Sequence, residues 1–131
     1  MPIREYTEAD QTALQEIHAA QSFDYQFPNL SNPLFVSKLI LEDPKHRIAM
    51  AALARLTCEI YLLADPNHGT PRTRFVNLLL LHRAAKQDLR IRGLEDAHAW
   101  LPPTIAKRFG KRLTQLGWTR DDAWTPYSIR F

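Results

Sequence analysis

Apolar residues recur at helical spacing in three segments of the chain. Residues 7–21 begin with a capping turn, Thr7-Glu8-Ala9-Asp10, and continue with apolar positions on one face. Thr70-Pro71 is a strong helix start, and a helix with a wide apolar face is predicted from there to residue 92. A third helix is predicted from about Thr104 to Leu116. The apolar face of the central helix comprises Phe75, Leu78, Leu79, His82, Ala85 and Leu89, and Gly93 closes that helix as a C-cap.

Other segments show the alternation of apolar and polar positions that is typical of β-strands. The alanine-rich segment 47–56 also allows a helix, because alanine has the highest helix propensity. Ile48, Met50 and Ala52 alternate there, however, and no capping residue precedes them, so a strand is predicted. In full, strands are predicted at residues 2–6, 35–42, 47–56, 57–64 and 94–101, and residues 118–131 can form a final strand pair.

A loop rich in aromatic residues follows the first helix. Residues 22–33 are irregular and contain Phe23, Tyr25 and Phe27. Aromatic rings are costly to leave in water, so these three either cap the core or line a substrate cleft, and capping is favoured. The order of elements is then β-α-irregular-β-β-β-α-β-α-β-β. This order predicts one domain over residues 1–131, of the α/β (α+β) class, with a mixed, mostly antiparallel sheet and helices on both faces.

Composition narrows the class of protein. The chain has 131 residues, of which 45% are hydrophobic and 24% charged, as expected of one soluble globular domain. No apolar run approaches the roughly 20 residues that span a bilayer, and the N-terminus has no apolar signal core, so a cytoplasmic protein without membrane contact is expected. The lone Cys58 is interpreted as a small buried hydrophobe, and no metal site is expected.

The charge is mildly basic. The formal net charge is +3, and the basic residues gather at 72–92 and 107–112. At helical spacing such residues are mostly solvated helix faces. A nucleic-acid partner would need a denser basic stripe with interleaved exposed aromatics, and none is expected here.

The C-terminal third supplies a family resemblance. A strand, a helix that ends in Leu116-Gly117-Trp118, and a terminal strand resemble the closing half of the GCN5-related N-acetyltransferase (GNAT) fold. The order of elements is similar over nearly the whole chain, and Leu116-Gly117-Trp118 is the residue-level match. The resemblance implies an acetyl-CoA-dependent N-acetyltransferase. It also implies that acetyl-CoA lies between the fourth and fifth strands, here 57–64 and 94–101, which should then form the main concave pocket.

In the GNAT family the cofactor pyrophosphate lies on backbone N–H groups at the start of the next helix, in a loop of the form Gln/Arg-x-x-Gly-x-Gly/Ala. Alignment on Leu78-Leu79 places this motif on residues 70–75. Both glycine positions are lost, Phe75 replaces the second of them, and Pro71 removes an N–H group. A modified CoA site and an ordinary helix N-terminus with solvated arginines both remain open. The cofactor-binding candidates are Leu62, Leu63, Gly69, Thr70, Arg72 and Arg74.

The resemblance also suggests catalytic groups. Family members often use a carboxylate on the fourth strand as general base, and Glu59 occupies that strand, with Tyr61 on the same face. The family's general-acid tyrosine corresponds to Leu113, so Tyr127 is its substitute. Asp96 and His98 share a face of the fifth strand, where they form either a catalytic base or a structural hydrogen bond. The catalytic candidates are therefore Glu59, His98 and Tyr127, and the substrate-binding candidates are Tyr25, Tyr61 and Asp96.

Three functions remain open at this point. The first is an enzyme that transfers an acetyl group to the amine of a small molecule or peptide. The second is a non-catalytic module that has kept a GNAT-like fold and lost CoA binding. The third is an interaction domain that forms a homodimer through its aromatic loop or its edge strands.

Overall fold

A computed structural model describes residues 2–131 and contains both helices and strands, which confirms the α+β class. The chain divides into two compact units, one ending at Cys58 and one formed by Glu59–Phe131. The helices are η1 (Glu8–Asp10), α1 (Gln11–Gln21), α2 (Pro71–Ile91) and α3 (Pro103–Gln115). The strands are β1 (Ile3–Glu5), β2 (Phe35–Glu42), β3 (Ile48–Arg55), β4 (Cys58–Glu59) and β5 (Ala97–His98).

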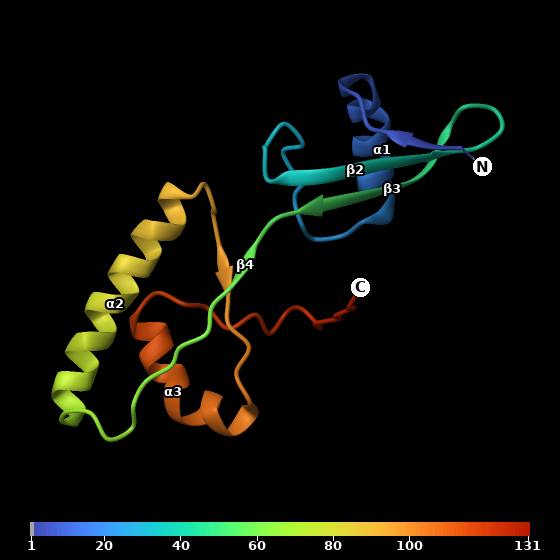
Figure 1. Ribbon diagram of the computed structural model, residues 1–131. Coiled ribbons are helices and arrows are strands. Elements are labelled where there is room, and N and C mark those ends of the chain that lie inside the picture. Colours follow the sequence, from blue (N-terminus) through green and yellow to red (C-terminus); the bar gives the residue numbers. More distant parts are fainter. Residues whose placement is uncertain (1) are drawn as a thin grey trace. The chain divides into compact units, whose positions relative to one another are not determined.

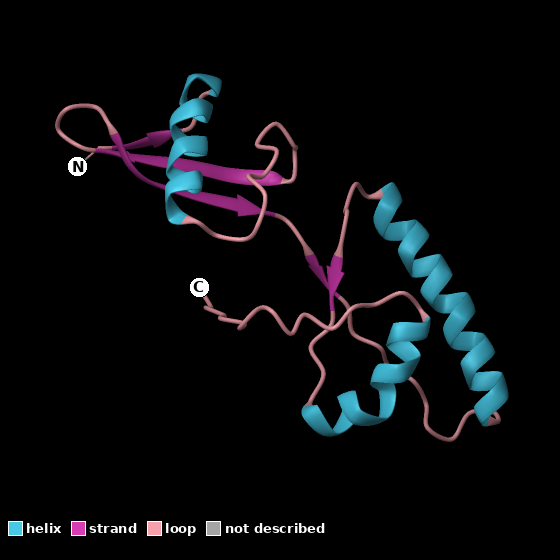
Figure 2. Ribbon diagram, turned by 180° about the vertical axis from the view of Figure 1, so that it is seen from behind, coloured by secondary structure: helices cyan, strands magenta, loops and turns pink. Residues whose placement is uncertain are grey.

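The N-terminal unit is a three-stranded antiparallel sheet with α1 on one face (Figures 1 and 2). Strand β2 lies in the centre, where Arg4 pairs with Ile40 and Ile40 pairs with Ala51. Because successive side chains of a strand point to opposite faces of the sheet, Ile40 lies on the face covered by α1. It is fully buried there and forms the core with Leu14 and Leu30. Phe27 packs against this cluster, so the aromatic loop does cap the core at that residue.

Residues 48–55 settle the choice between strand and helix. They form β3, which pairs with β2 over its whole length, with irregularities in the register at both ends. The strand prediction is therefore correct. Helix propensity is a weak preference, and pairing with a formed neighbouring strand outweighs it.

The C-terminal unit contains a strand–helix–strand crossover. Strands β4 and β5 lie side by side and run in the same direction, joined by the long helix α2 (Figure 1). Such a crossover through a helix is the usual way to connect parallel strands. The five strands thus form two ladders, β1-β2-β3 and β4-β5, and the predicted continuous sheet is not observed.

The strands of this unit are much shorter than predicted. The strands expected at 57–64 and 94–101 contain only Cys58–Glu59 and Ala97–His98, and residues 118–131 form no strand pair. A strand exists only where a neighbour accepts its hydrogen bonds, which alternation along the sequence does not reveal. Pro102 and Pro126 also lack a backbone donor near the predicted strand end and within the final segment.

Helix α2 contacts the α3 region through two residues of its predicted face, Phe75 and His82. Phe75, Leu78, His82, Ala85 and Leu89 are half-buried, whereas Leu79 is 38% exposed. The indole N–H of Trp118 donates to His82 Nε2 at 3.0 Å. The Arg112 guanidinium lies 4.4 Å from the centre of the Phe75 ring. The predicted packing of this helix centrally on the sheet is not observed: no residue of α2 is buried, and Leu80 and Leu81, which were to widen its apolar face, are 59% and 56% exposed.

The predicted C-terminal ends of α2 and α3 are confirmed, whereas α3 begins at Pro103, so Thr104 lies inside the helix rather than at its cap. Gly93 and Gly117 have φ angles of 85° and 95°, the left-handed conformation that terminates α2 and α3. Among residues 2–131, no helix combines the length and the apolar character that a membrane span requires.

Candidate functional site

The β4–β5 contact brings together two strands that each carry one predicted site residue, Glu59 on β4 and His98 on β5. The backbone N–H of Ile60 donates to the carbonyl of His98 at 2.8 Å, which places Glu59 and Tyr61 on either side of this bond along the chain. Glu59 and Tyr61 are two residues apart in an extended segment and interact directly. Their hydrogen bond raises the pKa of the Tyr61 hydroxyl, because the neighbouring carboxylate disfavours the phenolate.

The other predicted residues of these strands have different surroundings. His98 is half-buried, Asp96 is exposed and interacts with other residues, and Leu63 is 92% exposed. Leu62 and Leu63 follow the end of β4 rather than extending it. The side chain of Tyr127 is 93% exposed in a segment without regular structure, so the final strand pair that was to position it as a general acid is not observed.

The start of α2 is a capped helix N-terminus. Gly69 has a φ angle of 74°, and the Thr70 hydroxyl oxygen accepts from the Thr73 N–H at 3.2 Å. Pro71 occupies the first helical position and has no N–H group. The Arg74 guanidinium donates back to the Pro66 carbonyl at 3.1 Å. One N–H group that could hold a phosphate is therefore missing, and a second is engaged by the cap.

Phe75 lies in the second turn of α2 and contacts α3, rather than lying in an open loop. Its half-buried ring faces the Arg112 guanidinium, a cation–π contact between α2 and α3. Arg72 remains exposed in the first turn of α2. Among the cofactor-binding candidates, Arg72 is thus a solvent-facing cation beside the helix N-terminus, where the helix dipole also favours an anion.

Concave spaces occur in the N-terminal unit. One of about 490 Å³ lies between α1 and the β2–β3 turn, and one of about 260 Å³ lies beside Tyr6 and Lys38. Neither is lined by the two strands that were predicted to enclose the main pocket. Tyr25, predicted to bind substrate, also belongs to this unit, where its ring lies edge-on to His18 with the centroids 4.9 Å apart.

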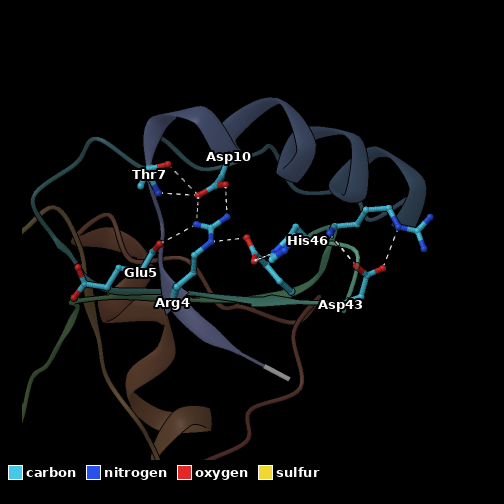
Figure 3. Close-up of polar contacts among 8 residues, drawn as sticks. Arg4, Glu5, Thr7, Asp10, Asp43 and His46 are labelled. Atoms are coloured by element: carbon cyan, nitrogen blue, oxygen red, sulfur yellow. Dashed lines mark hydrogen bonds and ion pairs between the residues drawn. The ribbon is translucent and has the colours of Figure 1, made fainter.

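Sequence reasoning missed an ionic network that borders the larger space (Figure 3). The Arg4 guanidinium donates two hydrogen bonds to the Asp10 carboxylate, both 2.8 Å long, and a third to Glu42 at 2.6 Å. The Thr7 N–H donates to Asp10 at 2.8 Å, as the predicted capping turn requires. His46, at the far end, lies 3.4 Å from Glu42.

The network has a strong effect on protonation. Hydrogen bonds from Arg4 lower the pKa of Asp10 to about 2, and they also lower the pKa of Glu42. Both carboxylates in turn raise the pKa of Arg4. The only sequence signal for this network was the capping turn, because nothing local indicates that residues 4, 10 and 42 meet. Since all three charges are mutually paired, the network is suited to holding β1, η1 and β2 together rather than to proton transfer.

No side-chain set within residues 2–131 gathers three or more His, Cys, Asp or Glu groups in a metal-binding arrangement. Searches against family models, curated proteins and solved structures found no match to this chain.

Proposed function

We propose that this chain is a GNAT-like, acyl-CoA-dependent N-acyltransferase that transfers an acetyl group to an amine. One observation carries the proposal. Two parallel strands, one bearing Glu59 and the other His98, lie side by side and are joined by a helix with a capped N-terminus. Acetyl-CoA would lie where these strands diverge, with its phosphates near the start of α2 and the cation of Arg72.

Glu59 is the general base in this proposal. It would remove a proton from the amine that attacks the thioester carbonyl, either directly or through a water molecule; the C–S bond then breaks, and the departing CoA thiolate takes a proton from solvent. Its exposed position at the end of β4 lets solvent and an amine reach it, and Tyr61 restrains the carboxylate by hydrogen bonding. The Ile60 N–H is engaged by His98, so a backbone N–H further along, at residues 61–63, would stabilise the oxyanion.

A second candidate function is a module of the same fold that does not bind CoA. A specific observation favours it: Pro71 supplies no N–H group, and the Thr70 cap engages that of Thr73. The two candidate functions differ in whether acetyl-CoA binds the protein and so stabilises it against unfolding.

The test is thermal unfolding of the purified protein with and without acetyl-CoA. Binding at a hundredfold excess over Kd stabilises a protein by about 2.7 kcal/mol, which is readily detected as a rise in Tm. Arg72→Ala should reduce this rise, whereas Arg90→Ala, which removes an exposed arginine from the last turn of the same helix, should leave it unchanged. Absence of any rise at millimolar acetyl-CoA would reject CoA binding and favour the second candidate.

A further inference from the structure

A cluster of aromatic rings surrounds His18 near the end of α1. Residues 22–27, which we term the ring loop, fold back so that Tyr25 and Phe27 both meet the imidazole edge-on, with centroid distances of 4.9 and 5.8 Å. Phe23 stacks on Tyr25 at 5.9 Å. All of these residues belong to the N-terminal unit.

The imidazole atom Nε2 of His18 is buried and has no hydrogen-bond partner, the only such side-chain atom identified among residues 2–131. Buried polar atoms in native proteins are nearly always hydrogen-bonded, and an exception calls for a physical explanation. With the imidazole proton on Nδ1, a group that donates a hydrogen bond to Nε2 would remove the penalty. A ligand of this site would therefore place a hydrogen-bond donor at His18 Nε2, next to an aromatic surface.

The surroundings specify the charge and shape of that group. Phe23 and Tyr25 are 55% and 42% exposed, so the cluster has an accessible aromatic surface. Asp24 stands between them in the sequence and is also exposed. Aromatic faces together with a carboxylate attract organic cations, and a primary ammonium also carries the N–H groups that His18 can accept.

Access to Nε2 requires the ring loop to move. Ser22 begins the loop as the C-cap of α1, with a φ angle of 58°, the left-handed conformation that commonly ends a helix. Phe27 packs against the core, so the ring that can shift to admit a ligand beside Nε2 is that of Tyr25, which is 42% exposed. The aromatic surface and the unsatisfied nitrogen thus lie within residues 18–27.

We propose that His18 and the ring loop form a binding site for a small primary ammonium ion with an apolar or aromatic substituent. The substituent lies against Phe23 and Tyr25, the ammonium group donates to His18 Nε2, and Asp24 balances its charge. The inference does not rest on the proposed function, because the site lies within the N-terminal unit and requires no CoA.

The probe is 2-phenylethylammonium chloride, titrated into the full-length protein with ¹⁵N-labelled histidine. Binding should shift the Nε2 resonance of His18 in a saturable manner, with amide shifts centred on residue 18 and the ring loop. The uncharged analogue 2-phenylethanol has the same aromatic ring and should bind about tenfold more weakly. His18→Phe keeps a ring in the cluster and removes the acceptor, so affinity should fall about fivefold to tenfold.

Asp24→Asn provides an independent test, because it removes the charge and leaves the rings in place. It should weaken binding of the ammonium probe without changing binding of 2-phenylethanol, and it decides the matter if His18→Phe does not fold. The inference is overturned if no resonance near His18 moves at about 10 mM probe. It is also overturned if the two probes bind equally well, or if neither substitution changes the affinity.

Discussion

Replacing Asp10 by asparagine should destabilise the N-terminal unit by about 2 kcal/mol at neutral pH. Asp10 is 7% exposed and accepts two hydrogen bonds from Arg4, each 2.8 Å long. Hydrogen bonds to charged groups contribute about 1.5–3 kcal/mol each when buried. The Arg4 side chain is 36% exposed, so solvent screening reduces that gain, and Arg4 keeps its bond to Glu42 in the variant.

The pH dependence of this effect has a definite sign. The pKa of Asp10 is lowered to about 2 in the folded protein from 3.8 for an unperturbed carboxyl, so the unfolded chain takes up the proton first as pH falls. The stabilisation is fully present above pH 3.8 and is lost as the pH falls towards 2. The difference between the native protein and Asp10→Asn should therefore be constant near neutrality and shrink below pH 3.8.

The assay must report on the correct unit. All three tryptophans, Trp100, Trp118 and Trp124, belong to the C-terminal unit, so their fluorescence does not follow the loss of the network. Amide hydrogen exchange at Ile40, in the centre of β2, reports the stability of the N-terminal unit directly. Glu16→Gln, an exposed carboxylate of α1, is the control and should change stability by less than about 0.5 kcal/mol. A loss below 0.5 kcal/mol for Asp10→Asn, or a loss that persists unchanged at pH 2, would refute the reasoning.

Three further predictions concern packing and capping. Ile40→Ala removes a fully buried side chain and should cost about 3 kcal/mol in urea unfolding, whereas Met50→Ala, at a position 66% exposed, should cost little; equal losses would contradict the assigned core. Thr70→Ala removes the cap of α2 and should cost about 1 kcal/mol by circular dichroism of thermal unfolding, and an unchanged Tm would show that the cap is not formed. Trp118→Phe removes the donor to His82 and should cost about 1–3 kcal/mol in the C-terminal unit; a neutral effect on hydrogen exchange along α2 would contradict this contact.

Local signals in the sequence predicted the helices well. Thr70-Pro71 and Gly93 flank α2 as expected, because an N-cap and a left-handed C-terminal residue act within a few positions of the chain. The strand at Ile48–Arg55 was also predicted from its alternation, against its helix propensity. In each case the deciding interaction is either local, as in the helix caps, or made with the adjacent element in sequence, as in the pairing of β3 with β2.

Non-local pairing explains what the sequence did not reveal. The apolar run 57–64 continues beyond β4, but the strand ends at Glu59 because its neighbour β5 contains only Ala97 and His98. The Arg4–Asp10 ion pair depends on η1 folding back over β1, which no periodicity records. The family resemblance implied that the strands bearing Glu59 and His98 are neighbours, and β4 and β5 do pair, although each contains only two residues.

The most direct test of the proposed activity is release of free thiol from acetyl-CoA by the purified protein in the presence of a panel of amines. An acyltransferase should release thiol only when a suitable amine is present, and Glu59→Gln should lower the rate by roughly 10²-fold with little change in Tm. Glu16→Gln, a matched change at an exposed glutamate of α1, should leave the rate unaltered. Amine-dependent thiol release that persists undiminished in Glu59→Gln would contradict the assigned base, and no release with any amine would contradict the proposed function.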